Sequence, residues 1–116
     1  MSNEKIARKK FAGGLAIYLD NFTDDQYAPP LLISPVNGIM GACSNCTEKE
    51  KAEIKEQVRE STKEMRKFLD GRSIKYQEFD YSSKLSVAGI KKRDLMEFAE
   101  QDYVYIIRED VSCEGY

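Results

Sequence analysis

Two of the three cysteines stand at a spacing that could carry chemistry. Cys43 and Cys46 form a C-x-x-C pair directly before a predicted helix. Such a pair can be a redox dithiol, because a helix N-terminus lowers the pKa of a thiol, or it can supply half of a zinc site. No second C-x-x-C pair and no histidine accompany it. We therefore favour inert loop cysteines, predict no metal, and keep Cys43 and Cys46 as possible redox residues.

The sequence contains no histidine, which limits the catalytic chemistry it could perform. Histidine is the commonest general base and the partner of the nucleophile in Ser–His and Cys–His pairs. The odd cysteine count, with Cys113 far from the other two, also argues against a disulfide framework. We predict no catalytic residues and no cofactor, and an interaction protein rather than an enzyme.

Composition and charge indicate one globular domain over residues 1–116. Hydrophobic residues make up 41% of the chain and charged residues 33%, which fits a folded domain with a single core. The net charge of −2 gives no general attraction to nucleic acid. No run reaches the ~18 apolar residues needed to span a membrane. We therefore expect neither nucleic acid nor a membrane as a partner. The sequence shows no signal peptide, which makes the chain cytoplasmic at face value or an excised part of a secreted precursor.

The hydrophobic pattern predicts the elements that must position any site. Gly14–Asp20 alternates apolar with other residues and predicts a half-buried strand. Residues 21–46 break the pattern and are predicted as an insertion loop, in which the LLISPV stretch is a short extra strand or a packed loop. A helix follows, with Thr47 and Glu50 as a capping box at its start and Gly71 as a left-handed stop.

The second half of the sequence predicts four more elements. Ser73–Tyr81 is expected to be a strand with a bulge near Gln77–Glu78. A short strand at 84–90, a short helix at 91–101 and a well-covered apolar strand at 103–109 follow. The order β-α-β-β-α-β with right-handed crossovers predicts an α+β, ferredoxin-like sandwich, in which a four-stranded antiparallel sheet carries two helices on one face.

This second half resembles the propeptide domain of subtilisin-like serine proteases, the inhibitor I9 family. The resemblance rests on the order of the segments IKYQEFDY, KLSVAGI, RDLMEFAEQ, DYVYIIRED and VSCEGY. Asp102–Val104 stands at the family's turn into the last strand, with Tyr103 where the family usually has a residue after proline, and Ile107–Asp110 stands at the strand end. The first half agrees more loosely, because the 21–46 insertion departs from the family's compact connection.

The resemblance implies a role for the C-terminal tail at residues 111–116. A peptide in a subtilisin-like cleft must be extended, so that its backbone can add to the enzyme's edge strands. With Tyr116 on the acyl side of the cleaved bond, the next three subsites would hold Gly115, Glu114 and Cys113. A rigid domain that holds this tail extended would keep it bound and block the site. Cys113–Tyr116 is therefore the predicted protease-binding element.

The resemblance also implies a role for Glu109 and Asp110. In the family, acids at this point cap helices on the protease surface, where unsatisfied N–H groups and the positive end of the helix dipole attract carboxylates. That docking would bring the sheet face against the enzyme, with tyrosines such as Tyr76 and Tyr105. Alternation alone leaves open whether these tyrosines face outward or fill the core, and a solvated strand end is the alternative for the two acids.

The predicted function is thus a propeptide-type chaperone and inhibitor of a subtilisin-like serine protease, acting in cis or in trans. Two alternatives stay open. One is a non-catalytic ferredoxin-like binding or regulatory domain that acts through the 21–46 insertion. The other is a dithiol redox protein that uses Cys43 and Cys46.

Overall fold

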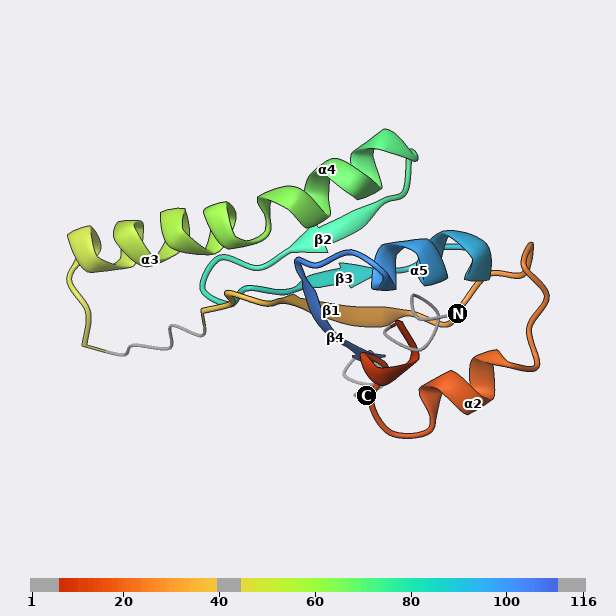
Figure 1. Ribbon diagram of the computed structural model, residues 1–116. Helices are drawn as coiled ribbons and strands as arrows, with labels where there is room; N and C mark the ends of the chain where they lie inside the picture. Colours follow the sequence, from red (N-terminus) through yellow and green to blue (C-terminus); the bar gives the residue numbers. More distant parts are fainter. Residues whose placement is uncertain (1–6, 40–44, 111–116) are drawn as a thin grey trace, which may run out of the picture.

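The computed structural model of the protein describes residues 7–39 and 45–110, which form a four-stranded sheet with its helices (Figure 1). All neighbouring strands are antiparallel, in the order β2-β3-β1-β4. The strands are β1 (Leu31–Pro35), β2 (Tyr76–Glu78), β3 (Leu85–Val87) and β4 (Val104–Glu109). The helices are α2 (Leu15–Leu19), α3 (Glu48–Ser61), α4 (Lys63–Gly71) and α5 (Lys92–Ala99). From β1 onward the elements follow the predicted β-α-β-β-α-β order, which confirms the α+β class and is compatible with a ferredoxin-like fold.

The LLISP stretch is a strand, which confirms one of the two alternatives predicted for it, but this strand is central to the sheet. The prediction that residues 21–46 form an insertion is therefore wrong. As β1 the stretch lies between β3 and β4, and Leu31 is paired with Val87 on one side and with Glu109 on the other. Its burial alternates, with Leu31, Ile33 and Pro35 buried. The ferredoxin-like unit therefore begins at β1, and residues 7–30 precede it.

The predicted strand at Gly14–Asp20 is also wrong, because Leu15–Leu19 is the short helix α2. Leu15 and Leu19 are buried, whereas Ile17 between them is 69% exposed. Residues four apart share one face of a helix, and residues two apart share one face of a strand. The apolar residues of this segment satisfy both spacings, so the pattern could not choose between them.

The long helix is confirmed at its start and differs at its end. Thr47 Oγ1 accepts a hydrogen bond from Glu50 N–H (3.1 Å) and Glu50 Oε1 accepts one from Thr47 N–H (2.9 Å), which is the predicted capping box. The helix is interrupted at Thr62, between α3 and α4, and Figure 1 shows α3 projecting beyond the strands. Gly71 is the last residue of α4, and the left-handed conformation belongs to Ser73 instead (φ 57°).

The described strands of the second half are shorter than predicted, and the bulge lies elsewhere. The β2–β3 register runs from Tyr76 to Glu78 without interruption, so the bulge expected near Gln77–Glu78 is absent from this pairing. The register shift occurs between β1 and β4, where Ser34 pairs with Ile106 and Pro35 with Val104. β4 is the last strand in the sheet order, but residues 10–12 pair with its outer edge through Ile107, whose N–H and C=O both form hydrogen bonds of 2.8 Å.

One face of the sheet carries the hydrophobic core. Buried residues from the strands join those of the helices in a single cluster, and Phe68 of α4 meets Phe98 of α5 at a ring distance of 4.8 Å. The helices α4 and α5 therefore cover this face together, and α2 completes the same core. The fully buried members with the largest side chains are Phe98, Leu19, Leu31, Ile33, Met65, Leu69, Leu85, Ile90, Leu95 and Ile107.

Candidate functional site

The face of the sheet opposite the core is the candidate site, and we call it the open face. Successive side chains of a strand point to opposite faces. Because Leu31, Ile33, Leu85, Val87 and Ile107 face the core, the residues between them face away from it. One row of directly paired residues crosses all four strands on this open face: Gln77, Ser86, Leu32 and Arg108.

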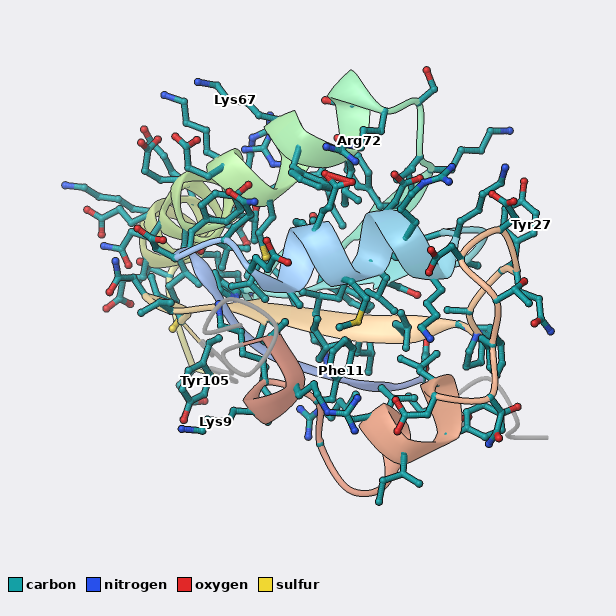
Figure 2. The ribbon with its side chains drawn as sticks, turned by 45° about the vertical axis from the view of Figure 1, so that its right-hand side comes forward. Lys9, Phe11, Tyr27, Lys67, Arg72 and Tyr105 are labelled. Atoms are coloured by element: carbon teal, nitrogen blue, oxygen red, sulfur yellow. The ribbon has the colours of Figure 1, made fainter. Side chains whose placement is uncertain are left out.

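The bulge in β4 gives the open face its most exposed aromatic side chain. Tyr105 is the residue left unpaired where the register shifts, and it is 63% exposed. A bulge often re-aims a side chain at the place where it occurs. Ile106, the next residue, is partly buried and pairs with Ser34 of β1. Figure 2 shows Tyr105 at the surface, on the opposite side of the molecule from Tyr27.

A hollow of about 380 Å³ lies on the open face beside Tyr105. Its floor comes from β1 and β4, and its rim comes from the segments that follow β1 and precede β3. Among the described residues, the lining contains two cationic side chains and no carboxylate. Its residues are Ser34, Pro35, Val36, Gly38, Ile39, Ser82, Ser83, Lys84, Tyr105, Ile106 and Arg108.

The rim of the hollow is held by the buried hydroxyl of Ser83. Ser83 Oγ accepts a hydrogen bond from Ile39 N–H (2.8 Å), and Ser83 N–H donates one to Ile39 O (2.8 Å). Ser83 Oγ also shares a hydrogen bond of 2.6 Å with Ser61 Oγ, which links the rim to the end of α3. At Gly38 an added Cβ would come within 3.3 Å of Ser83 Cβ and of Pro35 O, so the two sides of the rim approach closely. The hollow is therefore built into the fold.

The structure separates the two acids that were predicted to act together. Glu109 pairs with Leu31, which faces the core, and lines a hollow with residues 12–15 and Tyr18 on the helix side of β4. Asp110 instead receives a hydrogen bond from Ser86 Oγ through Oδ2 (3.0 Å), and Ser86 lies on the open face. Only Asp110 therefore belongs to the open face.

Tyr76 and Tyr105, the two tyrosines predicted to lie against the enzyme, are on opposite faces of the sheet. Tyr76 pairs with Val87 and packs against the core, where burial and a hydrogen bond to Asp70 raise its pKa. Tyr105 faces outward and lines the hollow. The sequence alone could not tell which face of the sheet each tyrosine occupies, because that depends on how each strand pairs with its neighbour.

The remaining predicted site residues fall mainly outside the described chain. Cys113, Glu114, Gly115 and Tyr116 lie there, as does Cys43. Cys46 lies inside it, directly before the Thr47 cap, and is engaged in a disulfide.

A second cavity, of about 320 Å³, lies between α2 and α5. Arg8 and Asp20 close one side of it with a paired contact of 2.7 and 3.0 Å, and this hydrogen bonding lowers the pKa of the Asp20 carboxyl. Lys92 Nζ, on the other side, donates a hydrogen bond to Phe22 O (3.0 Å). Arg8, Asp20 and Lys92 therefore have partners within the fold, while the carboxylates of Asp24 and Glu100 also line this cavity.

The residues that best define the hollow were not found from the sequence. Val36, Ile39, Lys84 and Arg108 come from three separate segments, and no motif joins them. The one local signal is in the YVYIIRE run, where Arg108 follows the inward-facing Ile107 and must point the other way.

Other kinds of site are not evident in residues 7–39 and 45–110. No described group of three or more Asp, Glu, Cys or His side chains is placed to hold a metal ion. None of the helices described in these two ranges has the length and apolar character to cross a membrane.

Comparisons of this chain with protein-family models, with curated proteins and with solved structures find no match. The case for a function therefore depends on the open face and on the sequence pattern.

Proposed function

We propose that this domain docks on a subtilisin-like serine protease through its open face, and that it inhibits and assists the folding of that enzyme. The observation that carries the proposal is the open face itself: one side of the sheet holds the core, while the other presents apolar, hydroxyl and cationic groups up to Asp110. The predicted cleft-binding residues, Cys113–Tyr116, follow Asp110 after only two residues.

An exposed sheet face suits both parts of the proposed role. As a chaperone, a preformed sheet gives the helices of an unfinished protease a surface on which to assemble. As an inhibitor, a rigid sheet reduces the entropy that must be lost on binding, because its side chains are already placed. The fold alone does not indicate this function, since ferredoxin-like sandwiches serve many roles.

Because Glu109 and Asp110 lie on opposite faces of the sheet, only one of them can contact the protease in the proposed docking. With the open face against the protease, Asp110 is the acid that can approach a helix N-terminus of the enzyme. Glu109 faces the helix side and would remain outside that contact. We therefore expect Asp110→Asn to weaken inhibition and Glu109→Gln to leave it unchanged.

The test is an inhibition titration of a purified subtilisin-type protease with this chain. A variant that lacks residues 113–116 should lose inhibition, because nothing then enters the cleft. Tyr105→Ala should weaken inhibition, because it removes the largest side chain exposed beside the hollow. Tyr27→Ala is the matched control, since Tyr27 is 60% exposed and lies on the other side of the molecule.

Three results would count against the proposal. They are the absence of inhibition by the full chain, an undiminished inhibition after the deletion, and equal effects of Tyr105→Ala and Tyr27→Ala. Replacement of both Cys43 and Cys46 by serine should not change inhibition. A loss of function from that double change alone would favour the dithiol redox alternative.

A further inference from the structure

We infer that the hollow beside Tyr105 binds an acidic segment of the partner protein, in which an apolar side chain is next to one or more carboxylates. The inference rests on the proposed function in one respect, that the open face is a docking surface. It specifies the chemical character of the partner segment that docks there. The C-terminal tail gives no information about that segment.

The charge of the hollow indicates an anionic partner. Arg108 and Lys84 line it, and none of the other described lining residues is acidic. Within the described chain Arg108 makes no ion pair or side-chain hydrogen bond, and the Lys84 ammonium lies 5.0 Å from the centre of the Phe79 ring without a carboxylate partner. Two cations without a carboxylate partner among the described residues therefore give the site charge complementarity to a carboxylate.

The walls of the hollow indicate an apolar side chain beside that carboxylate. Val36 is 50% exposed and Tyr105 63% exposed, and Ile39 and Ile106 complete the apolar lining. Burial of such surface against a partner is favourable in proportion to the area removed from water. The volume of about 380 Å³ is at the lower end of the range, roughly 300–1,000 Å³, that ligand clefts occupy.

The arrangement favours a protein segment over single-stranded RNA. Sheets that bind RNA stack successive bases on aromatic side chains. The central strands of this sheet present Leu32, Ser34 and Ser86 on the open face instead. Tyr105 is the sole aromatic residue in the lining of the described hollow.

The rim is fixed before any partner arrives, which favours selective binding. The hydrogen bonds between Ser83 and Ile39 hold its two sides together, and the bond from Ser83 to Ser61 ties them to α3. A partner segment would therefore meet cations and apolar walls at set positions, and less entropy would be lost on binding.

The inference can be tested with short peptides and proton–nitrogen correlation NMR of the full chain. The probe is an acetylated and amidated peptide with Leu-Glu-Glu at its centre, and the matched probe has Leu-Gln-Gln. The acidic peptide should shift the amide signals of residues 34–39, 82–84 and 105–108, and should bind about tenfold more tightly than the neutral one, as expected when a charge-assisted contact is lost. Added salt should reduce this difference.

Charge reversal supplies the second half of the test. Arg108→Glu and Lys84→Glu should each reduce the affinity for the acidic peptide by about tenfold. Lys67→Glu is the matched control, because it makes the same change of charge at an exposed position on α4, away from the hollow (Figure 2). Both altered side chains of the hollow lie at its surface, and the dispersion of the NMR signals checks that each variant is folded.

Several outcomes would overturn the inference. They are the absence of shifts at millimolar peptide, equal binding of the two peptides, and an Arg108→Glu variant that binds as the wild-type chain does. Tighter binding of oligouridylate at the same residues would assign the hollow to RNA instead. If the peptide binds but the protease is not inhibited, the proposed function fails and the inference stands. If wild type and Arg108→Glu inhibit the protease equally and no peptide binds, the inference fails and the proposed function stands.

Discussion

The two faces of the sheet are built from the same strands but differ in burial. On the covered face, Leu31, Ile33 and Ile107 are completely buried and stabilise the fold. On the open face, their immediate neighbours Leu32, Ser34 and Arg108 alternate with them and are partly buried or exposed. The comparison shows that a residue's role here depends on its phase along the strand, because neighbours in sequence serve opposite faces.

Ile106 and Ile107 offer the sharpest test of this difference. Ile107→Ala should lower the free energy of unfolding by about 2–5 kcal/mol, because it leaves a cavity in a packed core. Ile106→Ala should lower it by less than about 1 kcal/mol, since Ile106 lies at the edge of the hollow and is only partly buried. Urea unfolding of both variants measures the two values. Equal losses would break the comparison, because they would place both residues in one core.

The open face should also contain a structural element of its own at Ser83. Ser83→Ala should lower the free energy of unfolding by about 1–3 kcal/mol, because it removes the acceptor for Ile39 N–H and the partner of the Ser61 hydroxyl. It should also weaken binding to the hollow, since the rim is no longer held. Ser82→Ala is the control and should change the unfolding free energy by no more than about 0.5 kcal/mol. A stable Ser83→Ala variant would contradict the fixed rim.

The smallest expected effect is on the covered side, where surface charges join α4 and α5. Hydrogen bonds from Arg72 lower the pKa of the Glu97 carboxyl. The folded pKa lies below the unfolded value of about 4.3, so this contribution to stability is present above that value and is lost as the pH falls through the folded pKa. Glu97→Gln should therefore flatten the fall of stability at acidic pH.

The size of this effect should be no more than about 1 kcal/mol, because the pair is exposed and screened by water. Thermal unfolding of wild type and Glu97→Gln between neutral and acidic pH measures it. The Arg72 guanidinium also lies 4.4 Å from the centre of the Phe68 ring, and the substitution changes neither of these two residues. A steeper acid dependence in the variant would show that the assignment to Glu97 is wrong.

Local interactions explain the parts of the fold that could be predicted. The capping box of Thr47 and Glu50 forms between residues three apart, and it appears in the structure as expected. The helix at Lys92–Ala99 and the strand at Val104–Glu109 are also where their patterns placed them. Such elements depend on spacing and on nearby partners, both of which the sequence shows directly.

Elements that depend on distant partners were predicted less well. The LLISP stretch is too short to identify itself as a central strand, and its place is set by pairing with Val87 and Glu109. The GLAIYLD stretch fits a strand or a helix by pattern, and its helix is selected by burial of Leu15 and Leu19 in the core. The first strand of the fold was therefore predicted at residues 14–20 and not at LLISP, although the fold class was confirmed.

By itself, the sequence determined the α+β class and the capped helix that begins after Thr47. Only the tertiary structure decided which residues share a face. It placed Glu109 and Asp110 on opposite sides of the sheet, and it brought Val36, Lys84 and Arg108 together around one hollow. The physical reason is that strand phase and register follow from pairing between segments far apart in the chain, which no local pattern records.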